Sequence, residues 1–394
     1  MGLPNVSIEY QNGNLGLVAS ADDRVIAIVF NGYAQDSPPF VVYSYADFLG
    51  KRALLLADIG APLNVYIQNE VADFYQEAGD GRELWIKTVA PEMTTAQIFT
   101  VGAIEQLMQL SGGRINVIGV SRKLETTPGT ITRTGGIDAD IVAGLDEAQA
   151  KAVAMADLHM PFRVIVDGRY AAADLSTLAD LKGMSYNRVA VCIGSKGGAS
   201  GSNAAIGLVM GRIAGSPVNR NLGRVRSGAV GVDAGYFSNN TAVSTFAPGQ
   251  LDAIHNKGYI FLRKFANKAG YYWNDDHMAC PDTDDYFSLA NGRTIDKVAR
   301  LAYATFVEEL GDEVLVDEVT GKILPTQVKT YQTKIERAIT LQMKASGEIS
   351  GVKAFVDPAQ DIIATSMLVI DLRVTPMGTN RAIKVKLGLY NPNA

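Results

Sequence analysis

Apolar and polar residues alternate at the carboxyl end of the chain, within residues 382–390. Lys384 and Lys386 lie between apolar residues that recur at every second position. The apolar positions are Ile383, Val385, Leu387 and Leu389. A period of two is typical of a β-strand with one buried face. The pattern predicts a strand with a free edge, which can join a sheet of its own subunit or of another subunit.

The amino-terminal region contains a shorter alternation. Residues 1–23 are polar and rich in asparagine and glycine, but Val6, Ile8 and Tyr10 occupy every second position of one short piece. We expect an extended arm that holds this short strand.

Strands and helices alternate in the middle of the chain. Apolar runs predict strands at residues 24–30, 83–90, 114–122, 162–168 and 188–194. Apolar residues at helical spacing predict helices at residues 63–79, 145–160 and 173–184. This alternation indicates βαβ units around a mostly parallel sheet. The strands predicted at residues 162–168 and 188–194 are apolar almost throughout, as in strands that are covered on both faces.

The last third of the sequence has a different pattern. It predicts two long helices, at residues 291–310 and 326–345. Residues 361–374 are expected to pair with residues 382–390 in a hairpin, because the segment between them carries Pro376 and Gly378 in a turn-like context. The fold class is therefore α/β with α+β character: several domains, mixed sheets flanked by helices, an extended amino-terminal arm and a carboxyl-terminal strand.

Composition narrows the functions that this chain can have. A chain of 394 residues is too long for one ordinary core. A net charge of −5 gives no basic footprint, which argues against nucleic acid as a partner. No apolar run reaches the ~18 residues of a membrane span, so we expect no membrane partner, and the amino terminus does not resemble a secretory signal. Cys192 and Cys280 are too few and too far apart for a disulfide framework.

A glycine-rich segment, residues 194–203, follows a predicted strand and precedes a predicted helix, where phosphate-binding loops are built. It matches neither common phosphate-binding motif, because Lys196 precedes the glycines instead of leading into the helix. A surface loop is the favoured interpretation, and an α/β enzyme that binds a phosphate or nucleotide here is the alternative. In the helix that follows, Gly207, Gly211 and Gly215 form a smooth stripe that permits close packing.

Potential metal ligands are concentrated in residues 274–285, which contain five aspartates, His277 and Cys280. One histidine and one cysteine are too few for a zinc site, and the terminal glutamate of a calcium loop is absent. We interpret the segment as an acidic surface loop. The sequence thus predicts no catalytic residue, no cofactor and no metal, and the chain does not look like an enzyme.

The order of these segments resembles the sheath proteins of contractile phage tails and of related contractile injection systems. The similar segments are "RVIAIVFNG" and "PPFVVYSYADFLG" near the start, "AAIGLVMGRIAGSPVNRNLGRVRSGAV" in the middle, and "LDAIHNKGYIFLRKFANKAGYYWNDDHM", "NGRTIDKVARLAYATFVEEL" and "VDPAQDIIATSMLVIDLRVTPMGTNRAIKVKLGL" in the last third. The similarity is one of order and pattern, spread over most of the chain.

The resemblance implies a division into layers. Residues 1–23 would be the arm, residues 24–92 and 225–380 an inner core domain, residues 93–224 an outer α/β domain, and residues 381–394 the terminal strand. Subunits would exchange strands through the alternating residues at both ends. These residues are Val6, Ile8, Tyr10, Ile383, Val385, Leu387 and Leu389.

The resemblance also implies partners and a location. Copies of the chain would form a helical sheath of stacked hexameric rings around a tail tube protein, in contact with baseplate and tail terminator proteins. The two long helices near the carboxyl end would face the tube. The assembly would form in the cytoplasm of a bacterial host and belong to the tail of a virion, and its contraction would drive the tube through a target envelope.

Overall fold

A computed structural model describes residues 23–31, 38–51, 61–123, 131–198, 201–386 and 388. Its main feature is a six-stranded sheet in the order β2-β3-β1-β4-β7-β8. All neighbouring strands are parallel except β2, which runs antiparallel to β3 at one edge. The strands are β1 (Ile26–Asn31), β2 (Phe40–Val42), β3 (Leu84–Val89), β4 (Val117–Ser121), β7 (Arg163–Asp167) and β8 (Val189–Cys192). The predicted parallel sheet is confirmed, and five of its strands are buried along their whole length.

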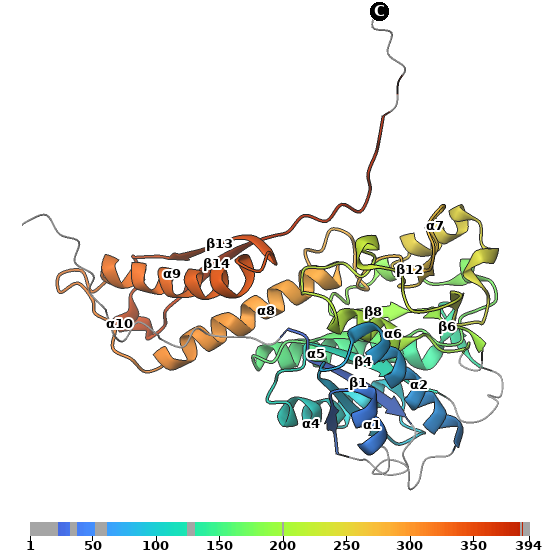
Figure 1. The fold of residues 1–394 in the computed structure, drawn as a ribbon. Helices are drawn as coiled ribbons and strands as arrows, with labels where there is room; N and C mark the ends of the chain where they lie inside the picture. Colours follow the sequence, from blue (N-terminus) through green and yellow to red (C-terminus); the bar gives the residue numbers. More distant parts are fainter. Residues whose placement is uncertain are drawn as a thin grey trace, which may run out of the picture.

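Helices cover both faces of this sheet (Figure 1). Helix α2 packs against α6 on one face, and α3, α4 and α5 lie on the other, as right-handed crossovers between parallel strands require. These helices are α2 (Ala61–Ala78), α3 (Thr95–Thr100), α4 (Ala103–Leu110), α5 (Ala139–Asp157) and α6 (Ile206–Ala214). The smaller elements of this body are α1 (Tyr45–Lys51), α7 (Pro248–Asn256), β5 (Arg133–Thr134), β6 (Ile137–Asp138), β9 (Gly194–Ser195), β10 (Tyr236–Phe237), β11 (Leu262–Arg263) and β12 (Tyr272–Trp273).

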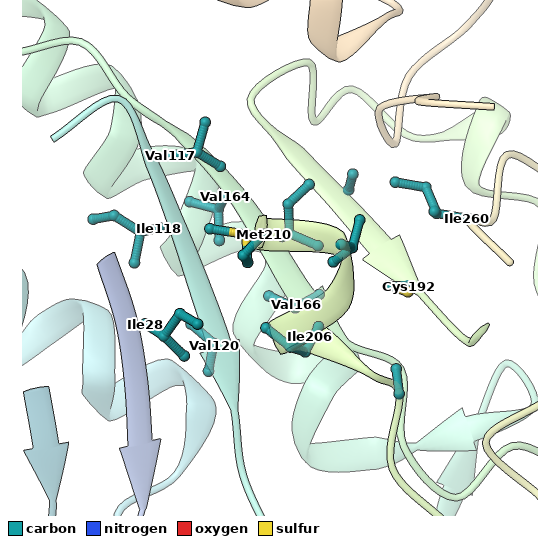
Figure 2. Close-up of a cluster of buried hydrophobic side chains, with 14 of the residues drawn as sticks. Ile28, Val117, Ile118, Val120, Val164, Val166, Cys192, Ile206, Met210 and Ile260 are labelled. Carbon is teal, nitrogen blue, oxygen red and sulfur yellow. The ribbon is translucent and has the colours of Figure 1, made fainter. Parts of the chain in front are cut away.

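The glycine stripe of α6 allows the helix to approach α2 closely, as the sequence predicted. A Cβ atom on Gly207 would lie 2.0 Å from the carbonyl oxygen of Glu70, and one on Gly211 would lie 2.3 Å from that of Phe74. The opposite side of α6 turns Ile206 and Met210 onto the sheet, among the buried valines and isoleucines of Figure 2. Helix α6 is thus buried on all sides.

One expectation for this body was wrong. Residues 173–184 form two 3₁₀ turns instead of a helix, because the Asp174 and Asp180 side chains each accept a hydrogen bond from the backbone two residues on and so favour turns. The main sheet crosses the boundary placed after residue 92, since β1 lies between β3 and β4. The assignment of segments to inner and outer layers of an assembly stays a prediction.

The carboxyl-terminal third forms an arm that extends from the body (Figure 1). Its elements are α8 (Leu289–Phe306), α9 (Pro325–Ile339), β13 (Ile349–Val356), α10 (Ile362–Thr365) and β14 (Ile370–Pro376). Leu301 of α8 packs with Ile335 of α9 and with Ile349 in a core separate from that of the main sheet. Among the helices of the described segments, none has both the length and the hydropathy of a membrane span.

The expected hairpin of residues 361–374 with residues 382–390 was wrong. The partner of β14 is β13, a strand that the sequence analysis did not predict, and the two run antiparallel from Ile349 opposite Pro376 to Val356 opposite Ile370. Ser350, Gly351 and Lys353 interrupt the apolar positions of β13, so its sequence does not show the regular alternation that predicts a strand. After Pro376 the chain runs to the body, which it contacts at Arg381, and then turns away from it; residues 377–386 form no strand (Figure 1).

Candidate assembly interface

The sheet of β13 and β14 has only two strands. One face, with Val352, Ala354, Leu372 and Val374, packs against the core of the arm, and Phe355 on the other face is 54% exposed. Within the described residues each strand pairs with one neighbour, so the outer backbone edge of each strand has no partner strand. Unpaired edges of this kind are templates for the addition of a further strand.

The segment after β14 carries the second half of this candidate interface. Ile383 is 80% exposed and Val385 is 70% exposed, although both are β-branched apolar residues. The other residues predicted for strand exchange are Val6, Ile8, Tyr10, Leu387 and Leu389, and these lie outside the described residues. The structure therefore combines an exposed segment with strand-forming residues and a short sheet with free edges.

Arg381 attaches this segment to the body two residues before Ile383. Its Nη2 atom lies 3.3 Å from Oδ1 of Asp275 and 3.3 Å from Oδ1 of Asp276, and its guanidinium group lies 4.4 Å from the ring centroid of Phe287. The Asp276 carboxylate also accepts a 2.9 Å hydrogen bond from the backbone N–H of Ala290 at the start of α8. The carboxyl-terminal segment thus leaves the body from a specific anchor.

The electrostatics of this anchor follow from burial. Burial and, to a smaller extent, the neighbouring Asp275 carboxylate raise the pKa of Asp276 to about 8, although Arg381 acts in the opposite direction. Burial acts on Asp275 in the same sense, but Arg381 and a hydrogen bond from Asn221 outweigh it and lower the pKa of Asp275. The acidic segment was expected at the surface, and this was wrong for Asp275, Asp276 and His277, which are buried.

The glycine-rich segment lies at the carboxyl ends of the central strands, where open α/β sheets bind ligands. Here the protein's own groups occupy that position. The Asn203 side chain donates to the carbonyl oxygen of Arg122 at 2.7 Å and to Oδ2 of Asp167 at 2.7 Å, and the backbone N–H of Ala204 donates to Oδ1 of Asp167. Lys196 forms an ion pair with Asp73. These polar groups of the described part of the segment are thus bonded to other groups of the protein.

The environment of Asp167 also shifts its pKa. Burial raises the pKa of Asp167 to about 7, although the hydrogen bonds from Asn203 and Ala204 act in the opposite direction. Within the part of the chain that the structure describes, no group of three or more histidine, cysteine, aspartate or glutamate side chains is arranged to hold a metal ion.

Solved structures similar to this one come from contractile assemblies. The helical sheath of the anti-feeding prophage in its contracted state matches with a TM-score of 0.66 and 15% identity, covering 98% of this chain and 99% of that chain. The contracted sheath complex of PVC, an extracellular contractile injection system, matches with a TM-score of 0.59 and 12% identity, covering 100% and 99%. The sheath tail protein from Listeria innocua matches with a TM-score of 0.52 and 9% identity, covering 92% and 94%. The sheath-protein fold expected from the sequence is therefore confirmed over nearly the whole chain.

No curated protein matched the sequence. Two family models match it one after the other: the DUF2586 N-terminal domain over residues 3–277, and the DUF2586 C-terminal domain over residues 285–394. The division between them lies just before α8, where the structure passes from the body to the arm. Together the two models span most of the sequence, and this chain belongs to the DUF2586 family.

Proposed function

We propose that this chain is the structural subunit of a contractile sheath, which polymerises helically around a tail tube and contracts to drive the tube into a target envelope. The observation that carries the proposal is the likeness of nearly the whole fold to sheath chains of two contractile injection systems and to a sheath tail protein. Both the body and the carboxyl-terminal arm take part in that likeness, since at least 92% of this chain is covered in each case.

Strand addition is the proposed link between copies. Residues 382–389 of one subunit add to a free edge of the β13–β14 sheet of a neighbour, and the backbone hydrogen bonds of the new strand hold the two copies together. Burial of Ile383 and Val385, which are 80% and 70% exposed in the single chain, contributes hydrophobic stabilisation. The amino-terminal residues Val6, Ile8 and Tyr10 are proposed as a second donor strand.

Contraction in this proposal is mechanical. Subunits rotate from a metastable extended array into a shorter and wider one, and the free energy comes from contacts formed in the contracted state instead of nucleotide hydrolysis. The tail tube, the baseplate and a tail terminator are the proposed partners, with α8 and α9 facing the tube. The proposed location is the tail of a virion that assembles in the cytoplasm of a bacterial host.

Electron microscopy of the purified, negatively stained protein tests the proposal directly. Long hollow cylinders are the expected result at high protein concentration. A discrete monomer under conditions that include high protein concentration and added tube protein would contradict the sheath function.

A truncation tests the link between copies. Deletion of residues 382–394 retains the Arg381 anchor and all elements of the body and arm, so the subunit should fold with unchanged thermal stability and yet form no cylinders. A finer test replaces one residue: Val385→Pro removes a backbone donor and disfavours strand pairing, whereas Val385→Ala keeps the backbone intact. Cylinder formation by Val385→Pro equal to that of Val385→Ala would rule out strand addition by this segment.

A further inference from the structure

A ridge of arginines lies on the body between α6 and β10. We call residues 217–228 the arginine ridge; it carries Arg220, Arg224 and Arg226. Arg220 and Arg226 are exposed, and none of the three has an ion pair with a carboxylate in the described chain. Nearby Arg212 differs, because it binds Glu77 at 2.6 Å and three backbone carbonyl groups. The ridge therefore carries positive charge that the subunit itself does not neutralise.

The surroundings of the ridge are shaped to receive another segment. Hollows of about 420 Å³ and 770 Å³ lie along it, and Arg220 and Arg224 line both of them. The larger hollow is also lined by the apolar side chains of Val225, Phe265 and Met377. Burial together with the like charges of Arg224 and Arg24 lowers the pKa of Arg220, so a nearby anion would relieve repulsion. The ridge suits a partner that is acidic and partly apolar.

The chain itself contains such a segment at the far end of the arm. We call residues 307–319, which follow α8, the acidic tip. The carboxylates of Glu308, Asp312, Glu313 and Glu318 are exposed, and in the described structure they have no cationic partner. The exposed apolar residues between them are Leu310 at 77%, Leu315 at 62% and Val319 at 85%. Apolar side chains this exposed among free carboxylates indicate a surface that a partner covers.

The ridge and the tip of one subunit lie at opposite ends of α9. Asn219 of the ridge donates a 3.1 Å hydrogen bond to Gly347, beyond the carboxyl end of α9, whereas the tip precedes its first residue, Pro325. Helix α9 and the π-helical turn Thr340–Lys344 that continues it together correspond to a length of roughly 30 Å at 1.5 Å per residue. The two complementary surfaces therefore cannot meet within one copy of the chain.

We propose that the acidic tip of one subunit docks on the arginine ridge of a neighbouring subunit. The contact rests on the proposed sheath function and names a second interface of that assembly, separate from strand addition. Because the two surfaces differ, each subunit offers one of each and the contact is head to tail, which propagates an open array when the rotation does not close. Carboxylates would pair with Arg220, Arg224 and Arg226, and the apolar tip residues would contact Val225 and Phe265.

A charge exchange tests this contact. The ridge variant carries Arg220→Glu and Arg226→Glu, the tip variant carries Asp312→Lys and Glu313→Lys, and the combined variant carries all four changes. The measurement is the fraction of protein that sediments as cylinders at low salt, with circular dichroism and thermal unfolding as the check on folding. A control with Arg133→Glu and Lys268→Glu changes the net charge by the same amount as the ridge variant, at exposed positions outside both surfaces and outside α8 and α9.

The ridge and tip variants should each raise the protein concentration needed for assembly by about tenfold, which corresponds to ~1.4 kcal/mol. The combined variant should recover most of this loss, and the control should assemble like the unmodified chain. Assembly of both single-surface variants at the unmodified concentration, or no recovery in the combined variant, would overturn the contact while leaving the sheath function intact. Failure of the unmodified chain to form cylinders would overturn both proposals.

Discussion

Gly211 shows how one missing side chain sets the distance between two helices. The nearest backbone atom of α2 would lie 2.3 Å from its Cβ, well inside van der Waals contact, and that atom belongs to a carbonyl group that cannot rotate away. At Gly215 the corresponding distance is 3.2 Å, so the helices are already separating. The contact is thus tightest at Gly207, at 2.0 Å, stays close at Gly211 and loosens toward Gly215.

Gly211→Ala should lower the free energy of unfolding by about 1–3 kcal/mol, because overpacking outweighs the gain in helix propensity. Chemical denaturation monitored by circular dichroism measures the effect. Gly249→Ala in α7 is the matched control, since no atom lies within 4 Å of the added methyl group, and it should be neutral or slightly stabilising. Equal effects at both positions would refute the close-packing argument.

At the scale of elements, a buried ion pair joins α8 to the main sheet. Arg163 at the start of β7 donates from Nε to Asp296 of α8 at 2.7 Å and from Nη2 to the same carboxylate at 3.1 Å. Arg163 also donates to the carbonyl oxygen of Asn187, and Arg188 adds a second cation at 3.2 Å from Asp296. Because α8 continues into the arm, this pair attaches the arm to the body.

Asp296→Ala should cost about 3–5 kcal/mol of stability, because it leaves the buried Arg163 guanidinium without its counter-ion. Thermal and urea unfolding give the magnitude. Asp371→Ala removes an acid from a pair whose side chains are 50% and 79% exposed, and should change stability by less than about 0.5 kcal/mol. A small effect of Asp296→Ala would mean that the other contacts of α8, such as the hydrogen bonds from Arg300 to Ile115 and Pro161, hold it on the sheet without this ion pair.

At the scale of the whole molecule, buried carboxyl groups make stability depend on pH. The pKa of Asp167 is about 7 in the folded chain and 3.8 in its unperturbed state. Folding therefore favours the protonated form. The stability from this group is fully present below about pH 4 and is lost as the pH rises through 7. Burial also raises the pKa of Asp276, to about 8, so the two groups act in the same direction.

Asp167→Asn should flatten the decrease in unfolding free energy between pH 4 and pH 7. The pKa difference corresponds to a loss on the order of 4 kcal/mol over this interval, since one unit is worth about 1.4 kcal/mol. The readout is the slope across a pH series, because the amide also changes the hydrogen bonds to Asn203 and Ala204 at every pH. A slope identical to that of the unmodified chain would show that Asp167 stays ionised when buried.

The elements that local pattern predicted well are those whose environment is uniform. The runs that became β1, β7 and β8 are apolar on both faces, so their burial did not depend on which strand lies beside them. The close packing of α6 could also be predicted, since glycines that recur every four residues usually mark a close contact between helices. Order and pattern together were sufficient to predict the sheath-protein fold.

Contacts between residues that are distant in the sequence could not be predicted from local pattern. Alternation at residues 382–390 indicated a strand but carried no information about its neighbour. The expected pairing with β14 was wrong, since β14 pairs with β13 and residues 377–386 form no strand. The acidic segment was predicted to be exposed to solvent because its sequence gives no sign of its partners. In the structure, Arg381 contacts Asp275 and Asp276, and the start of α8 donates a hydrogen bond to Asp276, so both carboxylates are buried.

The amino-acid order alone was enough to specify the parallel sheet, the glycine contact of α6 and two ends rich in strand-forming residues, because each depends on residues close in the chain or on burial from all sides. The pairing of β13 with β14, the anchor at Arg381 and the separation of the arginine ridge from the acidic tip arise only when the chain is folded. These features depend on contacts between residues tens to hundreds of positions apart, and local periodicity carries no record of them.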